Sequence, residues 1–144
     1  MDDAAVAQQC AAKMYAADQA SQDLGIQVEV KSPGCAQARL SVRPNMLNGH
    51  DVCHGGFIFT LADTAFAFAC NTHNKVTLAA GASIEFLRPA KLGDLLIATA
   101  AERHRGGRSG IYEVVVTNQD DVDVALFRGR SHMTSKPLLP SNDT

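Results

Sequence analysis

The spacing of apolar and polar positions changes several times along this chain of 144 residues. The stretch Ala4–Gln22 is rich in Ala, Gln and Met, a composition that favours a helix, and Gly25 is placed to end it. Two segments that alternate apolar and polar residues, Ile26–Val30 and Ala36–Val42, flank Ser-Pro-Gly, which is typical of a β-hairpin. We therefore expect one helix over about residues 4–24, followed by two strands.

The middle of the chain has a different pattern. Pro44–His54 contains a Pro, two Asn and a Gly, which predicts an irregular loop. Two glycines, Gly55 and Gly56, then lead into Phe57–Cys70, which is apolar on every side. This pattern is typical of a central buried helix.

The second half alternates again and is divided by turn residues. It predicts a meander of four strands: Thr77–Leu87, Leu95–Arg103, Gly110–Thr117 and Val122–His132. The segment Lys136–Thr144, which contains two prolines, is expected to be a frayed tail.

One apolar helix and an antiparallel sheet indicate an α+β fold in which the sheet curls around the helix. The length and the 46% apolar content suit a single domain over residues 1–144. Because the helix face opposite the sheet is also apolar, we expect a dimer or a larger assembly that covers this face.

Charge and composition exclude several classes. A net charge of -2 argues against nucleic acid as the main partner. No basic leader precedes an apolar segment, and Asp63 interrupts the apolar stretch Gly55–Lys75, which leaves it short of a membrane span. The expected location is the cytoplasm. The four cysteines show no CxxC spacing, so free thiols are expected.

Asp63 is the one acidic residue in this apolar stretch. A carboxylate is costly to bury unless it is hydrogen bonded or its pKa is shifted, so Asp63 is a candidate for chemistry. Its alternative role is to cap or pair with a group in the core.

An Asn at position 48 and an Asp at position 63 enclose a His-Gly-Gly turn. Four blocks follow in order: HGG (His54–Gly56), LADTAFA (Leu61–Ala67), FLRPA (Phe86–Ala90) and ALFRG (Ala125–Gly129). With these blocks the chain resembles the hotdog-fold acyl-CoA thioesterases, in particular the PaaI type of phenylacetate degradation. The resemblance covers nearly the whole chain and implies an antiparallel sheet wrapped around a long central helix.

Thioester hydrolysis explains these residue types. Negative charge develops on the carbonyl oxygen, and the Gly55 N–H at a helix N-terminus is a positive dipole aimed to stabilise it. Asp63 is expected either to attack the carbonyl or to act as general base on water. Asn48 is expected to orient the water or to hold the carbonyl, although a simple turn is its alternative role. His54 is expected to shape the turn or to hydrogen bond near the substrate.

The spacing of these residues constrains the site. Gly55 and Asp63 are eight positions apart, which corresponds to about 12 Å along one helix. If both act on one thioester, Asp63 must come from one subunit, and Asn48 and Gly55 from its partner. The resemblance implies the same arrangement, in a dimer of dimers (a homotetramer) with its sites at the dimer interface.

Two other chemistries are disfavoured. His50, Asp51 and His54 superficially match the zinc motif HExxH, but the flanking glycines argue against the helix that this motif needs, and no metal is expected. Cys53 and His54 are neighbours in sequence, and neighbouring side chains rarely face each other as a nucleophile and its base do.

Coenzyme A, as part of the substrate, needs cations for its phosphates, and no further cofactor is expected. Candidates crowd the strand ends and the HRGGRSG turn: Arg88, Lys91, Arg103, Arg105 and Arg108. One or two of the phenylalanines at positions 57, 59, 66 and 68 are candidates to line a pocket for an aromatic acyl group.

We therefore predict a thioesterase that hydrolyses phenylacetyl-CoA or hydroxyphenylacetyl-CoA, an acyl preference that comes from the resemblance. Two alternatives remain open. A hotdog acyl-CoA hydratase or dehydratase would keep the fold and the carrier, and a non-catalytic acyl-CoA binding module would use Asp63 only as an anchor.

Overall fold

The computed structural model describes residues 1–141, which begin with two short helices, α1 (Asp3–Ala17) and α2 (Gln19–Leu24). The prediction of one helix was wrong at Asp18. Its carboxylate accepts hydrogen bonds from the Ser21 N–H at 2.9 Å and the Ser21 hydroxyl at 2.6 Å, and so caps a new helix. Gly25 ends α2 with a φ of 77°, as expected of a glycine C-cap.

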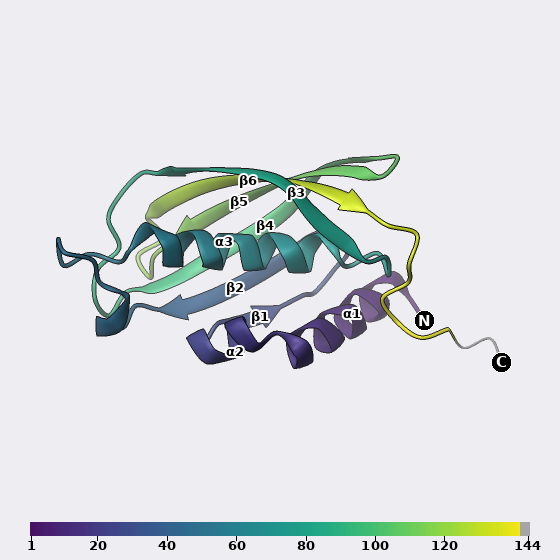
Figure 1. Cartoon of the computed structure of the whole chain (residues 1–144), viewed down its shortest axis with the longest axis horizontal. Helices are drawn as coiled ribbons and strands as arrows, with labels where there is room; N and C mark the ends of the chain where they lie inside the picture. The colour runs from purple at the N-terminus through teal and green to yellow at the C-terminus, as the bar shows by residue number, and fades with distance from the viewer. Residues whose placement is uncertain (142–144) are drawn as a thin grey trace.

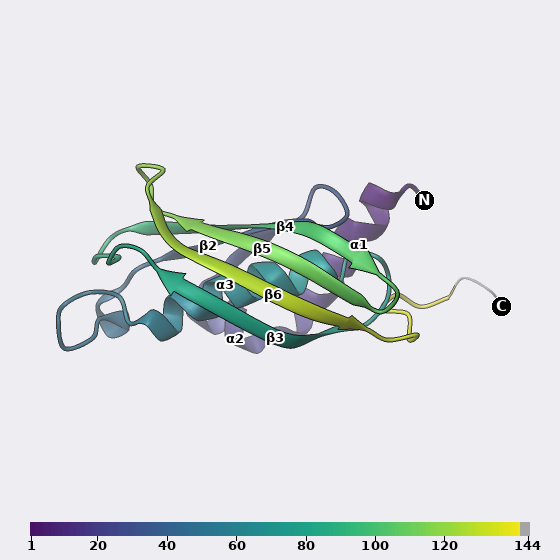
Figure 2. The same cartoon turned by 90° about the horizontal axis from the view of Figure 1, so that it is seen from above.

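Six antiparallel strands form one sheet in the order β1-β2-β4-β5-β6-β3 (Figures 1 and 2). The strands are β1 (Gln27–Glu29), β2 (Cys35–Ser41), β3 (Thr77–Phe86), β4 (Leu95–Gly106), β5 (Ser109–Thr117) and β6 (Asp123–Met133). All six predicted strands are confirmed, but the four-strand meander is not. β3 pairs with β6 and not with β4, because the connection over residues 87–94 carries the chain across the sheet.

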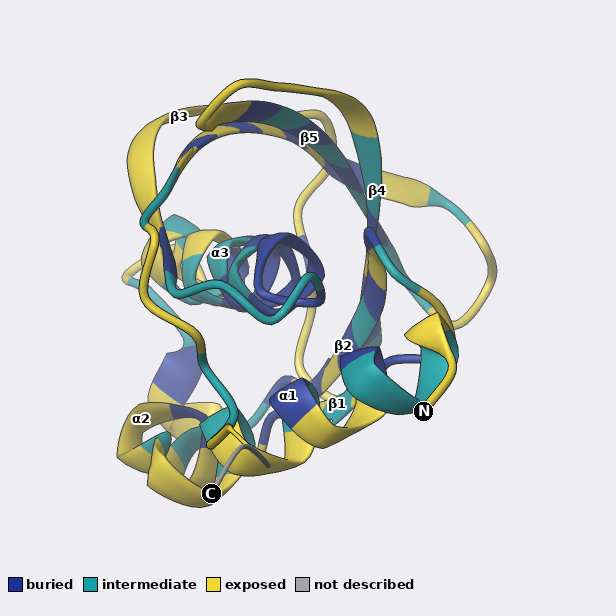
Figure 3. Cartoon of the chain, turned by 90° about the vertical axis from the view of Figure 1, so that its right-hand side faces the viewer, coloured by how far each residue is buried: buried dark blue, intermediate teal, exposed yellow. Residues whose placement is uncertain are grey.

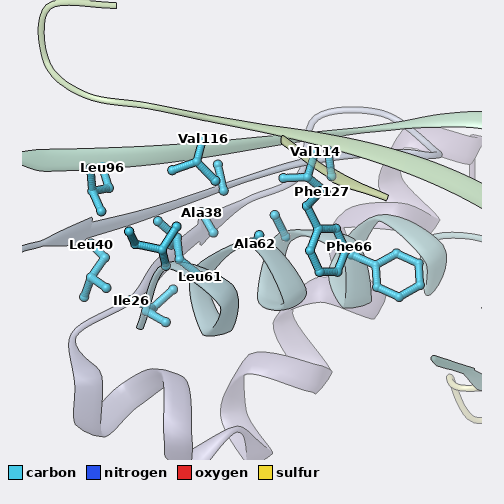
Figure 4. Packing of buried hydrophobic residues seen from close by; sticks show 14 of the residues in the cluster. Ile26, Ala38, Leu40, Leu61, Ala62, Phe66, Leu96, Val114, Val116 and Phe127 are labelled. Atoms are coloured by element: carbon cyan, nitrogen blue, oxygen red, sulfur yellow. The ribbon is translucent and has the colours of Figure 1, made fainter. Parts of the chain in front are cut away.

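The sheet curls around α3 (Gly55–Cys70), a helix of 16 residues that Figure 3 shows nearly end-on. Leu61, Ala62 and Phe66 point from this helix toward the sheet (Figure 4). The fit is close at Gly129 on β6, where an added Cβ would lie 2.7 Å from the Phe66 ring. The α+β fold and the buried role of the central helix are thus confirmed for the sheet-facing side.

The other side of α3 is open in the single chain, as expected for the face that a partner subunit would cover. Five residues, of which Phe59 and Thr60 are adjacent and the others follow at intervals of three or four, are exposed or half-buried: Gly56, Phe59, Thr60, Asp63 and Ala67. Their spacing places them on one face of the helix. We call this row the open stripe of α3.

An edge of the sheet is also uncovered. β3 pairs with β6 on one side and has no strand on the other within residues 1–141. Most of its side chains are exposed, including Leu78 (56%) and Phe86 (53%). A long apolar edge strand is a template for pairing with another chain.

The C-terminal segment departs from the frayed tail that the prolines predicted. The Lys136 carbonyl accepts from the Val76 N–H, and the Leu139 N–H donates to the Asn74 carboxamide oxygen. Lys13 on α1 donates to the Leu138 carbonyl at 2.6 Å. Residues 136–139 are therefore attached to the fold, whereas residues 142–144 lie outside the described part. Across residues 1–141, no helix has the length and apolar character needed to span a membrane.

Candidate functional site

The His-Gly-Gly turn is anchored from both sides before α3 begins. The His54 N–H donates to the Met46 carbonyl at 2.8 Å, at the end of a short 3-10 helix (Pro44–Met46). The Cys53 N–H donates to the Ala90 carbonyl at 2.7 Å. These two backbone bonds fix the position at which the helix starts.

His54 engages one of the two glycine N–H groups at the start of α3. Its Nδ1 accepts a hydrogen bond from the Gly56 N–H at 3.0 Å, as the N-cap of α3. The Gly55 N–H, in contrast, has no partner among residues 1–141. A free N–H at a helix N-terminus can donate a hydrogen bond to an oxyanion, and the positive end of the helix dipole strengthens this interaction.

Gly55 is also tightly approached. A Cβ at this position would lie 3.0 Å from Cζ of Phe86, at the end of β3. A side chain here would push against the Phe86 ring, so a glycine fits this position best.

Asn48 lies in the loop that leads to this turn, and its side-chain oxygen is already used. Oδ1 accepts from the His50 N–H at 2.9 Å and from the Val52 N–H at 3.3 Å, an Asx-type turn. The Nδ2 group has no partner among residues 1–141. Asn48 therefore does make a turn, and it is left with a donor for a carbonyl oxygen rather than an acceptor for water.

The loop at Asn118 has the same construction. Its Oδ1 accepts from the Asp120 N–H at 2.9 Å and the Val122 N–H at 3.2 Å. Asp51 and Asp121, the fourth residues of the two loops, have φ values of 59° and 61°. Asn118 is thus an internal structural copy of Asn48 without a glycine turn and a helix behind it.

Asp63 is half-buried in the open stripe of α3. Burial raises the pKa of its carboxyl above the ordinary value, because desolvation disfavours the charged form. Its carboxylate has no hydrogen bond or ion pair within residues 1–141. A carboxylate without a partner and with a raised pKa is suited to accept a proton or to attack an electrophile.

One chain does not bring these groups together. Asp63 and Gly55 lie on the same unbroken helix, so about 12 Å separates them along its axis. Asn48 and His54 lie at the Gly55 end. The structure therefore places three of the four predicted residues together and leaves Asp63 two turns away.

The predicted coenzyme A cations are divided between the two ends of the sheet. Arg88 follows β3 near Gly55, and its Nη1 donates to the Asp123 carbonyl, while the Lys91 side chain is exposed beside it. Arg105 and Arg108 lie at the β4–β5 hairpin, at the end where β3 begins (Figure 1). The ten residues of β3 span about 30 Å, so one chain cannot gather these four cations around one nucleotide. The fifth candidate, Arg103, pairs with Glu113 at 3.5 Å.

Residues 49–52 form turns and bends, so the HDVCH segment lacks the helix that a zinc motif needs. Cys53 is buried, and its thiol lies 3.6 Å from the His54 carbonyl oxygen and not against the imidazole. Burial raises the pKa of this thiol, the opposite of what a nucleophilic cysteine requires.

The sequence-based predictions did not include a polar cluster at the other end of α3. Glu102 accepts from the Tyr112 hydroxyl at 2.7 Å and contacts His73 Nε2 at 2.8 Å. Burial alone would raise the pKa of Glu102, but the hydrogen bonds from Tyr112 and His73, together with electrostatic attraction to His73 and Arg105, outweigh it and lower the pKa. The alternation of β4 already placed Glu102 on the inward face with Leu96 and Ala98, a signal that predicts a partnered carboxylate.

Comparisons with known proteins identify the family of this chain. The thioesterase superfamily model matches residues 50–125. The acyl-coenzyme A thioesterase PaaI of Escherichia coli K12 is 47% identical over 83% of this chain and 85% of its own length.

Solved structures give the same result. The E. coli PaaI protein from the phenylacetic acid degradation operon superposes with a TM-score of 0.92, at 43% identity, over 94% of this chain and 99% of that one. A Streptococcus mutans UA159 protein bound to acetyl CoA gives a TM-score of 0.74, at 28% identity, over 78% and 90%. This chain therefore belongs to the thioesterase superfamily, and it is a thioester hydrolase with the hotdog fold.

Proposed function

We propose that this protein hydrolyses arylacetyl-CoA thioesters, such as phenylacetyl-CoA or hydroxyphenylacetyl-CoA, to the free acid and coenzyme A. One observation carries the proposal: the unpartnered Gly55 N–H and the unpartnered Asp63 carboxylate lie on one helix, the latter in its open stripe. The aromatic acyl group is supported by the E. coli relative, which comes from a phenylacetic acid degradation operon.

Two chains share each site in this proposal. Antiparallel packing of two α3 helices through their open stripes brings Asp63 of one chain to Gly55 and Asn48 of its partner. The uncovered β3 edge supports such a dimer, because two copies of this edge can extend one sheet into the other.

Each residue then has a role in the reaction. The Gly55 N–H and the Asn48 amide donate to the carbonyl oxygen and stabilise its negative charge. His54 positions the turn by holding the Gly56 N–H. Asp63 either attacks the carbonyl carbon or removes a proton from the attacking water, and coenzyme A leaves as its thiolate.

Antiparallel packing also brings the cations of the two chains to the same end of the dimer. The partner's β4–β5 hairpin comes to the end of the dimer where Arg88 and Lys91 of the first chain lie. We assign these two residues, with Arg105 and Arg108 of the partner chain, to the phosphates of coenzyme A. No cofactor besides the substrate is invoked.

We further propose that these dimers pair into tetramers and work in the cytoplasm. Leu126, 42% exposed on the outward face of β6, supports a second contact between dimers. The mass of the purified protein in solution, from light scattering, tests the tetramer.

The test of function is thiol release from a panel of acyl-CoA thioesters. Arylacetyl thioesters are expected to give the highest kcat/KM, and a flat panel would contradict the proposed substrate. The assay needs a Cys35→Ser background, because Cys35 is the exposed cysteine and would react with the thiol reagent. Turnover without thiol release would indicate a hydratase or dehydratase.

Replacing Asn48 by Ala is expected to lower kcat roughly 100-fold through loss of a donor to the oxyanion. The Asn118→Ala variant is the matched control, because it removes the same Asx turn elsewhere. Equal kcat losses, or equal kcat retention, in the two variants would show that Asn48 only makes its turn. Steady-state kinetics and thermal unfolding of both proteins provide the comparison.

Removing either pair of cations, by Arg88→Ala/Lys91→Ala or by Arg105→Ala/Arg108→Ala, is expected to raise KM roughly tenfold with kcat nearly unchanged. Lys31→Ala/Arg39→Ala, which removes two exposed cations at the far edge of the sheet, is the control. Unchanged KM in a pair would exclude that pair from coenzyme A binding.

A further inference from the structure

Phe59 is the one large apolar side chain in the open stripe of α3. It is 36% exposed, and the other four members of the stripe are Gly56, Thr60, Asp63 and Ala67. Its ring lies edge-on against Phe127 of β6, with centroids 5.4 Å apart and planes at 66°. Phe127 in turn contacts the buried Phe66. Phe59 is thus a partly exposed ring that packs on Phe127, in a row whose other members are small or polar.

Its position in the sequence is informative if each site is shared, as proposed above. A two-fold axis that places Asp63 of one chain at Gly55 of the other must place Gly55 at the other's Asp63 as well. In two antiparallel helices, the residue halfway between these positions then faces its own copy. That residue is at position 59.

We infer that Phe59 packs against Phe59 of the partner subunit on the two-fold axis, between the two active sites, and sets the offset of the two α3 helices. Phe59 is then a positioning residue. A slip of one helical turn between the helices would move Asp63 about 5.4 Å from the partner's Gly55, out of reach of the same thioester. The support from Phe127 prevents the ring from folding away.

A residue on a two-fold axis can be cross-linked to its own copy. In a Cys35→Ser background, Phe59→Cys is expected to give a disulfide-linked dimer on mild oxidation, because a disulfide requires Cα atoms within about 7 Å. Ala67→Cys is the matched control in the same stripe. Its two copies would lie about 24 Å apart along the helices, so it is expected to remain monomeric on a non-reducing gel.

Phe59→Cys that stays uncross-linked, or Ala67→Cys that cross-links as well, would overturn the inference. Failure of the cross-link can be told apart from failure of the shared site, because the shared site is tested separately by mixing two inactive variants. If activity returns in mixed dimers but Phe59→Cys does not cross-link, the shared site is supported and the position of Phe59 on the two-fold axis is rejected.

The positioning role has its own readout. Phe59→Ala is expected to lower kcat at least tenfold in protein that remains folded, whereas Phe59→Leu, which retains bulk on the axis, recovers most of the rate. A role limited to packing against Phe127 would lower the melting temperature and leave kcat of the folded enzyme unchanged, which would also overturn the inference.

Discussion

Replacing Asp63 by Asn is expected to lower kcat about 1000-fold while the protein stays folded. The amide keeps the shape of the side chain but can neither accept a proton from water nor attack the carbonyl. Thiol release by the purified variant measures the effect. Asp120→Asn, an exposed loop carboxylate changed in the same way, is the control. Unchanged turnover in Asp63→Asn would show that Asp63 does not take part in the reaction.

The same variant is expected to be more stable than the wild type at neutral pH. The raised pKa of Asp63 means that the folded protein binds its proton more tightly than the unfolded chain does. Wild-type stability therefore falls as the pH rises from the ordinary aspartate pKa through the raised one. In thermal unfolding, the melting temperature of Asp63→Asn should exceed that of the wild type increasingly as the pH rises through this interval. The difference should vanish in stronger acid.

The raised pKa also predicts the acid limb of the rate profile. If Asp63 acts as an anion, kcat/KM falls as the pH drops through its pKa, with a midpoint above the ordinary value of 3.8. A midpoint at or below that value would show that burial does not govern this carboxylate in the active enzyme.

Mixing two inactive variants is expected to restore activity if each site is shared. In a mixed dimer of Asp63→Asn with Asn48→Ala, one site carries both changes and the other carries neither. Random mixing makes half of the dimers mixed, so roughly a quarter of wild-type activity should return, by the symmetry of a two-fold dimer. Co-expression of the two chains and thiol-release kinetics measure the recovery.

The control is Asp63→Asn mixed with the double variant Asp63→Asn/Asn48→Ala, which cannot form an intact site. Activity restored in the first mixture and absent from the second would assign Asp63 and Asn48 to different chains. No recovery in mixed dimers whose formation has been verified would place the site within one chain and remove the reason for a shared one.

Local patterns predicted the secondary structure well, and the errors have physical causes. Alternation in β3 and β6 identified both strands, but it carries no information on which strands become neighbours, so the pairing of β3 with β6 was missed. The single N-terminal helix was wrong because Asp18 can serve as a helix interior residue or as an N-cap. Only the Ser21 hydrogen bonds distinguish the two.

In the candidate site, too, residue patterns predicted some features, and hydrogen bonds in the folded chain were needed for the rest. A free Gly55 N–H could be proposed from two glycines before a helix, but its distinction from Gly56 depends on the imidazole of His54. The two possible roles of Asn48 were open in the sequence, and the hydrogen bonds of its loop use the oxygen and leave the amide.

Residue types and their spacing were enough to predict the elements of the sheet, the single carboxylate in an apolar helix, and the eight-residue gap between Gly55 and Asp63. These features follow from residue type and from the fixed rise of a helix, which are local properties. The packed fold was needed to show that Asp63 lies in an open stripe, that β3 lies at an edge of the sheet, and that the cations divide between the two ends of the sheet. These features depend on how segments distant in the sequence pack against one another. Neither the periodicity nor the spacing of residues along the chain encodes that packing.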